Sequence, residues 1–169
     1  IAPIPGISME KAEGQPPTVP SLLYVQDGQT GKVVAGQAVI KAGLDRRRDN
    51  RLFRNFKRGI VAMPAPEPRS IDGVSWGDRD AGRYFLYRLF GALPYRCDEI
   101  EQVVLTAPVA AFEGYLAWLN EVIDGFAPEQ VRIVDESTAA ALGYAVNEPG
   151  AAVLVLDFGG CLLYTSDAA

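Results

Sequence analysis

The sequence from Val131 to Gly160 constrains the fold more than any other part of the chain, because it places a helical segment between two β-prone runs. A short β-branched run begins at Val131, an alanine-rich segment follows, and residues 152–158 are almost entirely apolar. Continuous apolar strands are typical of a sheet that is covered on both faces. We therefore expect an α/β protein with a mixed sheet flanked by helices.

Acidic side chains stand at the ends of both predicted strands. Glu136 follows the first strand, and Asp157 lies near the end of the second, just before Gly159 and Gly160. Carboxylates can hold a hydrated Mg²⁺ and orient a water molecule. Glycine lets backbone N–H groups come close to phosphate oxygens. The pattern is therefore compatible with a site for a metal ion and a phosphate.

The composition excludes several classes of site. The chain has 169 residues, enough for one hydrophobic core and too few for two ordinary domains. It has no histidine, which excludes a His general base and His-ligated zinc. Cys97 and Cys161 are too few for a disulfide framework or a four-cysteine metal site. With so few cysteines, we expect a reduced, cytoplasmic setting. No run of eighteen or more apolar residues appears, so we expect no membrane span and no membrane partner.

The first half of the chain predicts a hairpin, a basic helix and a loop. Residues 21–25 and 32–35 are β-prone and flank an Asp-Gly pair, which indicates a hairpin. Between Asp45 and Arg58, four arginines have the spacing of one helical face. We expect that face to be solvated and to bind no nucleic acid, because no stacking aromatics accompany the arginines. Residues 63–77 are rich in proline and glycine and predict a loop.

The second half of the chain predicts a long helix and a strand-helix-strand unit. Helical spacing of apolar residues extends from about Asp78 to Leu93, and Trp76 should pack where that helix begins, with a partner for its indole N–H. A strand over 102–106, a helix over about 111–125 and a strand from Val131 should form a unit with parallel strands. Asp135 or Ser137 can cap the alanine-rich helix.

Two motifs in this stretch resemble the seventy-kilodalton heat-shock chaperones, the DnaK-like family. The segment Glu136-Ser137-Thr138-Ala139-Ala140-Ala141 resembles the family's Glu-Pro-Thr-Ala-Ala-Ala, and Asp157-Phe158-Gly159-Gly160 resembles its Asp-hydrophobic-Gly-Gly turn. Shorter matches are Pro20-Ser21-Leu22-Leu23, Gly36-Gln37-Ala38, Phe56-Lys57-Arg58-Gly59 and Thr106-Ala107-Pro108. The resemblance implies that residues 1–160 form a partial nucleotide-binding domain, the first lobe and the start of the second, with the actin-like, ribonuclease H-like fold.

The resemblance also implies an ATPase site with ATP and Mg²⁺ as ligand and cofactor. Lys57, Glu136 and Asp157 match catalytic positions: Lys57 would face the γ-phosphate, Glu136 would orient metal-bound water, and Asp157 would act on the metal through water. Gly159 and Gly160 would approach a phosphate. ATP and ADP are the implied ligands of the complete protein, and unfolded peptides and co-chaperones are its implied partners.

Pro108 matches the proline that acts as a switch between the lobes in this family. The aromatic residue and the arginine that follow this proline in the family are missing here. A nucleotide-binding scaffold without chaperone activity therefore stays open as an alternative. Another actin-fold protein, such as a sugar kinase or a filament protein, would share the Asp-Gly-Gly turn, but the Glu-Ser-Thr-Ala-Ala-Ala segment and the Phe-Lys-Arg match argue against it.

We expect the sequence to be truncated at both ends. It starts at Ile1, and the resemblance places the family's first phosphate loop upstream of that residue. Residues 161–169 are a literal translation of a transposon-end adapter used in sequencing libraries, so native sequence is expected to stop at Gly160. We therefore expect the 169-residue chain to hydrolyse no ATP without its missing parts.

Overall fold

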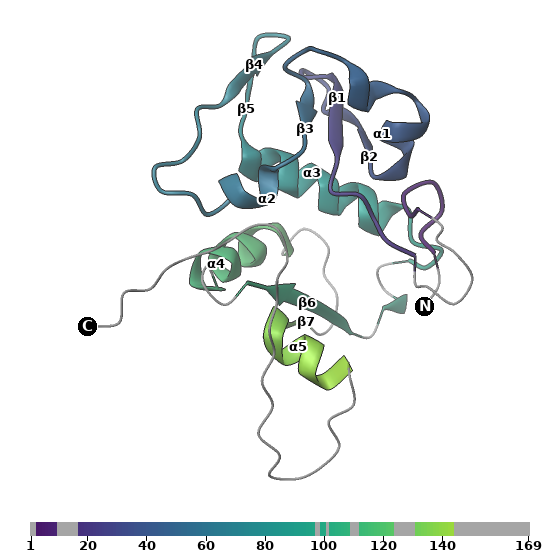
Figure 1. Cartoon of the computed structure of the whole chain (residues 1–169), viewed down its shortest axis with the longest axis vertical. Coiled ribbons are helices and arrows are strands. Elements are labelled where there is room, and N and C mark those ends of the chain that lie inside the picture. The colour runs from purple at the N-terminus through teal and green to yellow at the C-terminus, as the bar shows by residue number, and fades with distance from the viewer. Residues whose placement is uncertain are drawn as a thin grey trace.

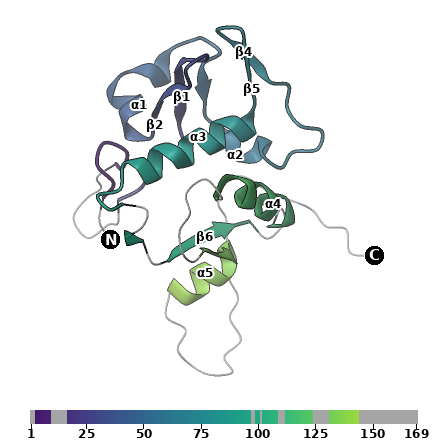
Figure 2. The same ribbon diagram turned by 180° about the vertical axis from the view of Figure 1, so that it is seen from behind.

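The computed structural model of the chain describes residues 3–9, 17–96, 99–100, 102–108, 112–123 and 131–143. Within these residues, helices and small sheets form an α/β arrangement, as expected. The long helix α3 (Asp78–Gly91) lies between the strands of the first half of the chain and the last two described strands (Figures 1 and 2). None of the helices described is long and apolar enough to cross a membrane. The predicted strand over 152–158 lies outside the described residues.

The first sheet is antiparallel, with the order β2-β1-β3. Strands β1 (Leu23–Asp27) and β2 (Lys32–Ala35) form the predicted hairpin, and β3 (Leu52–Phe53) pairs with the other edge of β1. Alternate side chains of a strand point to opposite faces, and both faces of this sheet are covered. The main core takes Leu23, Val25 and Phe53, whereas Tyr24 and Leu52 pack on the other face with Val39 of α1 (Gln37–Lys41) and Leu44.

The predicted amphipathic helix over 45–58 is wrong. The structure has a 3-10 turn η1 (Leu44–Arg46), then strand β3 and one helical turn α2 (Phe56–Gly59). Leu52 and Phe53 are adjacent and both buried, at 8% and 1% exposure. A strand sends neighbouring side chains to opposite faces, so here each enters a different core. Pairing with β1 therefore outweighs the helical spacing of the arginines.

The predicted loop over 63–77 is wrong in its second half. Strands β4 (Arg69–Ile71) and β5 (Val74–Trp76) form an antiparallel hairpin. Asp72 and Gly73 make its turn, with φ of +53° and +80°. Asp-Gly is favoured in two-residue hairpin turns whose central residues both have positive φ. The sequence contains this Asp-Gly turn signal, but the prolines just before it at 64, 66 and 68 favour a loop.

Helix α3 confirms the helix predicted from about Asp78. At its start, the Asp80 carboxylate accepts a hydrogen bond of 3.0 Å from the backbone N–H of Gly77, which satisfies a donor at the helix N-terminus. Trp76 is buried immediately before the helix, and its Nε1 donates to the carbonyl of Gly28 at 3.1 Å. The prediction that this indole would find a partner at the junction is therefore confirmed.

Helix α4 (Phe112–Ile123) packs against α3 at a glycine. A Cβ atom at Gly82 would lie 2.7 Å from Cζ2 of Trp118 and 2.8 Å from Cδ1 of Ile60. The missing side chain at residue 82 therefore allows this close contact. Through it, one hydrophobic core continues from the first sheet to the helix and strands of the second half of the chain.

Strands β6 (Val103–Ala107) and β7 (Val131–Asp135) are parallel, as predicted. Helix α5 (Glu136–Gly143) begins at the carboxyl end of β7. Asp135 caps it: one carboxylate oxygen accepts the Thr138 N–H at 2.8 Å, and the other accepts the Thr138 hydroxyl at 2.5 Å. Of the two candidates, Asp135 and Ser137, the structure thus shows Asp135 as the cap. In open α/β sheets, ligands bind at this carboxyl end of the strands.

Candidate functional site

The carboxyl ends of β6 and β7 carry two of the predicted site residues. Ala107 pairs with Asp135 in the parallel register, so the next residues, Pro108 and Glu136, stand at the same edge. Both oxygens of Asp135 accept hydrogen bonds from Thr138, which hold the pKa of Asp135 below its usual value. Glu136 is exposed. Among the residues described at this edge, Glu136 is therefore the carboxylate that remains available to a ligand.

Lys57 lies on the single turn of α2, and its side chain is exposed. Tyr115 on α4 holds this turn, because its hydroxyl donates a hydrogen bond to the backbone carbonyl of Lys57. The Tyr115 ring packs edge-on against Trp118, with 6.3 Å between ring centroids. Helix α4 therefore fixes the backbone that carries Lys57.

Burial and the charge of Glu136 both affect the pKa of Tyr115. Burial, with the negative charge of Glu136 as the smaller cause, raises the pKa of Tyr115 to about 12. The phenol therefore stays protonated at neutral pH and keeps donating its hydrogen bond. The same hydroxyl holds the backbone of Lys57 and has its pKa raised in small part by the charge of Glu136. No motif in the sequence singled out Tyr115, which lies within the helix predicted over about 111–125.

The structure thus places Pro108 and Glu136 at one edge of the β6 and β7 pair, and it holds the Lys57 backbone against Tyr115 of α4. Asp157, Gly159 and Gly160 lie outside the described residues, so their places in the site stay predictions. In the part of the chain that the structure describes, no three His, Cys, Asp or Glu side chains gather as metal ligands. A single exposed carboxylate still fits Mg²⁺, which usually keeps several waters and takes one or two carboxylates together with phosphate oxygens.

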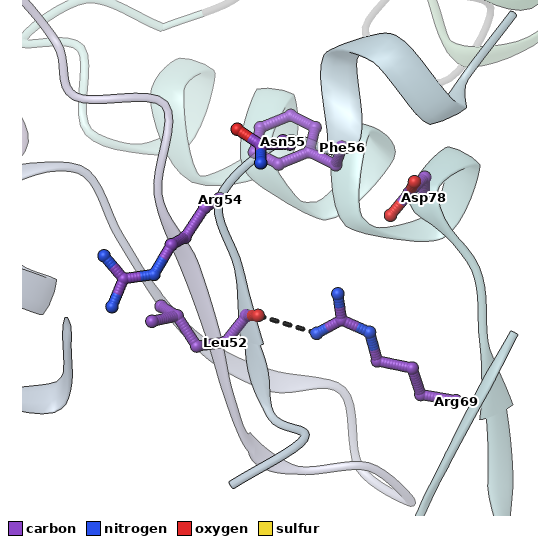
Figure 3. A pocket seen from close by; sticks show the side chains of 6 residues that line it. All are labelled: Leu52, Arg54, Asn55, Phe56, Arg69 and Asp78. Carbon is purple, nitrogen blue, oxygen red and sulfur yellow. Dashed lines mark hydrogen bonds between the residues drawn. The ribbon is translucent and has the colours of Figure 1, made fainter. Parts of the chain in front are cut away.

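A separate hollow of about 180 Å³ opens between β3, α2 and the start of α3 (Figure 3). Arg69 lies within it, fixed by hydrogen bonds to the carbonyls of Leu52 at 2.6 Å and Asn50 at 3.1 Å, with its guanidinium 4.1 Å from the Phe53 ring centroid. Burial raises the pKa of Asp78, which also lines the hollow, although Arg69 acts against the shift. Ligand pockets usually exceed about 300 Å³, so this hollow is too small for a nucleotide.

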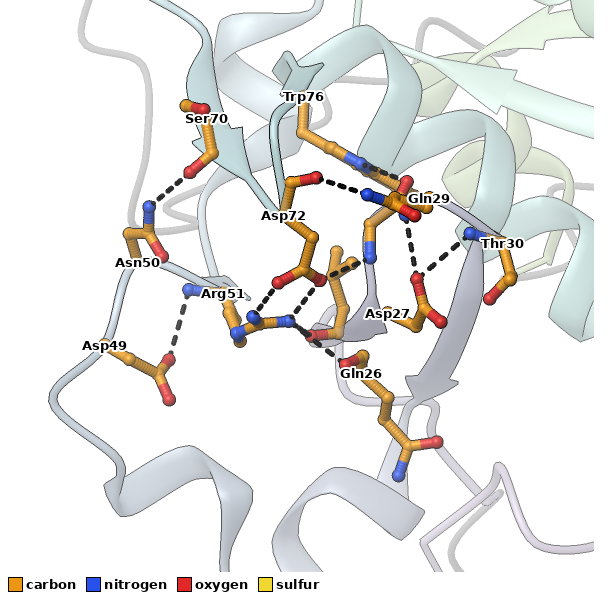
Figure 4. A network of polar contacts seen from close by, with 12 residues as sticks. Gln26, Asp27, Gln29, Thr30, Asp49, Asn50, Arg51, Ser70, Asp72 and Trp76 are labelled. Atoms are coloured by element: carbon orange, nitrogen blue, oxygen red, sulfur yellow. Dashed lines mark hydrogen bonds and ion pairs between the residues drawn. The ribbon is translucent and has the colours of Figure 1, made fainter.

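A polar network ties the first hairpin to the second (Figure 4). Arg51 forms an ion pair with Asp72, whose carboxylate also accepts the Gly28 N–H at 2.8 Å. These two hydrogen bonds, the one from Arg51 first, hold the pKa of Asp72 below its usual value. Gln29 adds a side-chain hydrogen bond of 3.1 Å to the Asp72 carbonyl. All these contacts join protein groups to each other, so the network stabilises the two turns.

Comparison with known protein families adds no assignment, since no family model matches the chain. The functional proposal therefore depends on the sequence motifs around Lys57 and Glu136 and on the hydrogen bond between Tyr115 and Lys57.

Proposed function

We propose that the chain is part of the ATP-hydrolysing domain of a DnaK-like chaperone, with an actin-like lobe. The observation that carries the proposal is the hydrogen bond from the Tyr115 hydroxyl to the Lys57 carbonyl, and the smaller contribution of the Glu136 charge to the raised pKa of Tyr115 supports it. Lys57 and Glu136 are far apart in the sequence, and each matches a catalytic position of the family in its own motif. A common neighbour for both is what a single catalytic site requires.

The chemistry of each residue suits its role in the proposal. Glu136 accepts a hydrogen bond from the attacking water and orients it. Lys57 brings a compact positive charge to the γ-phosphate and stabilises the charge that develops as the terminal bond breaks. Asp157 would bind the metal ion through water, and Gly159 and Gly160 offer backbone N–H groups to a phosphate. Mg²⁺, when bound, neutralises charge on the phosphate oxygens.

Pro108 has the remaining role in this proposal. It stands beside Glu136 at the edge of the parallel pair, and its ring restricts the backbone at that point. A rigid residue next to the water-orienting carboxylate suits a switch that links the state of the nucleotide to the second lobe. Unfolded peptides and co-chaperones are then the partners of the complete protein, and the cytoplasm is its setting.

The test is single-turnover ATP hydrolysis by the complete gene product that carries this sequence. Lys57→Ala and Glu136→Gln should each slow hydrolysis by about 10²-fold or more, the usual effect of removing one contact that stabilises the transition state. Lys32→Ala and Glu67→Gln are matched controls, because both side chains are exposed outside the site, and they should leave the rate unchanged. A Lys57→Ala rate equal to that of the wild type would refute the proposal.

The same preparation separates the alternatives. A nucleotide-binding scaffold would bind ATP without turnover, which fits the missing aromatic residue and arginine after Pro108. A chaperone should hydrolyse ATP faster when an unfolded peptide is added. A sugar kinase would instead release ADP only in the presence of a sugar.

A further inference from the structure

Residues 41–58 concentrate positive charge in an acidic protein. The segment has eight basic and two acidic side chains, a net charge of +6, while the whole chain carries −5. The segment forms no continuous helix: Lys41 ends α1 and Arg46 ends η1, while Lys57 and Arg58 lie on α2. We define the basic patch as Lys41, Arg46, Arg48 and Arg54, all of which are exposed. Arg54 joins η1 by a hydrogen bond to the carbonyl of Asp45.

The two carboxylates of the segment differ in their contacts. Asp49 accepts hydrogen bonds from the Tyr24 hydroxyl at 2.7 Å and from the Arg51 N–H at 3.1 Å. One carboxylate oxygen of Asp45 is buried and has no hydrogen-bond partner among the described residues. The ion pairs found among the described residues involve Arg51, Arg79 and Arg83, none of which belongs to the patch. The patch therefore presents positive charge to the solvent without a paired carboxylate.

Two other arginines of the segment have structural roles, which sets them apart from the patch. Arg47 lies over the Tyr24 ring, 5.9 Å from its centroid, and reaches the Tyr24 hydroxyl at 3.4 Å. Arg51 pairs with Asp72 and also donates to the carbonyl of Gln26 at 3.0 Å. The fold thus accounts for these two guanidinium groups but not for those of Arg46 and Arg48.

An apolar side chain borders the patch. Ile40 precedes Lys41 on α1 and is 38% exposed. Its carbonyl accepts the Gly43 N–H at 2.9 Å, in the turn that leads directly to η1. Tyr24, the aromatic residue beneath Arg47, is buried and offers no face for stacking a base. Positive charge next to an aliphatic side chain suits an acidic peptide better than a single-stranded nucleic acid, which needs stacking surfaces.

We propose that the basic patch is the docking surface for an acidic segment of a partner protein, with an aliphatic side chain of that segment resting on Ile40. The first sheet separates α1 and η1 from the core that contains α3. This inference does not rest on the proposed ATPase function.

The test measures fluorescence anisotropy of a labelled peptide of repeated Glu-Glu-Leu mixed with the protein. Arg46→Glu/Arg48→Glu should weaken binding by about tenfold, because two exposed attractions become repulsions. The matched control is Arg88→Glu/Arg132→Glu, which changes the net charge equally with two exposed cations on α3 and β7 and should leave binding within about twofold. Wild-type binding should weaken as salt rises beyond about 0.15 M.

A second variant and a second probe decide between occupants. Ile40→Ala should weaken binding of the peptide by about threefold, the effect of losing a partly buried aliphatic contact. Binding of a thymidine oligonucleotide should be unaffected. Tighter binding of the oligonucleotide than of the peptide would overturn the choice of an acidic protein. Absence of peptide binding, or an equal loss in both double variants, would show that the patch is only solvated. Circular dichroism checks that each variant is folded.

Discussion

The contact between α3 and α4 predicts that even one methyl group at residue 82 destabilises the fold. In Gly82→Ala the new Cβ would lie 2.7 Å from Trp118 and 2.8 Å from Ile60, where nonbonded carbons normally stay about 3.5–4.0 Å apart. Trp118 and Ile60 are only 5% and 4% exposed. The Ile60 methyl group can rotate away, but the buried Trp118 ring cannot move without disturbing the core around it.

Two opposing terms set the size of the effect. Alanine improves helix propensity over glycine by about 1 kcal/mol in a helix interior. Overpacking a core by one methyl group costs about 1–3 kcal/mol, and the upper end applies because a rigid, buried ring is in the way. The net prediction for Gly82→Ala is a loss of about 2 kcal/mol of unfolding free energy. Gly91, at the exposed end of the same helix, has nothing within 4 Å of a new Cβ, so Gly91→Ala should gain about 0.5 kcal/mol.

Urea unfolding, followed by tryptophan fluorescence and far-UV circular dichroism, measures both variants. With a slope of about 2 kcal/mol per molar urea, the midpoints of the two variants should differ by roughly 1 M. Equal midpoints would mean that α4 does not pack on α3 at this position. The position of α4, and with it the contact between Tyr115 and the Lys57 backbone, would then be wrong.

Two further predictions concern pH. The folded pKa of Asp72 lies below its ordinary 3.8, so the Arg51 pair stabilises the fold above about pH 4, and this contribution is lost as the pH falls through the folded value. Asp72→Asn should lower the urea midpoint at pH 7 and flatten its acid dependence, and parallel acid profiles would contradict the pairing. The folded pKa of Tyr115 is about 12 against 10.0 ordinarily, so its unfolded form loses its proton first, and stability should decline between about pH 10 and 12. Tyr115→Phe should reduce this decline, and an unchanged decline would refute the burial of the hydroxyl.

Local residue order was sufficient for the elements with strong signals of their own. The hairpin of β1 and β2 follows from two β-prone runs around Asp27-Gly28, and α3 follows from repeated apolar spacing. The parallel pairing of β6 and β7 follows from the helix that separates them in the sequence. For the site, the motifs selected Glu136 and Lys57 separately, and the expectation that they share one site came from the family resemblance.

Contacts between distant segments were needed for the rest, because local spacing does not say what a segment packs against. Residues 45–58 have helical spacing, yet β1 draws Leu52 and Phe53 into a strand between two cores. No motif singled out Tyr115, yet packing turns its hydroxyl to the backbone carbonyl of Lys57. Periodicity reports the preference of a segment, whereas the neighbours that bury it determine which preference the folded chain keeps.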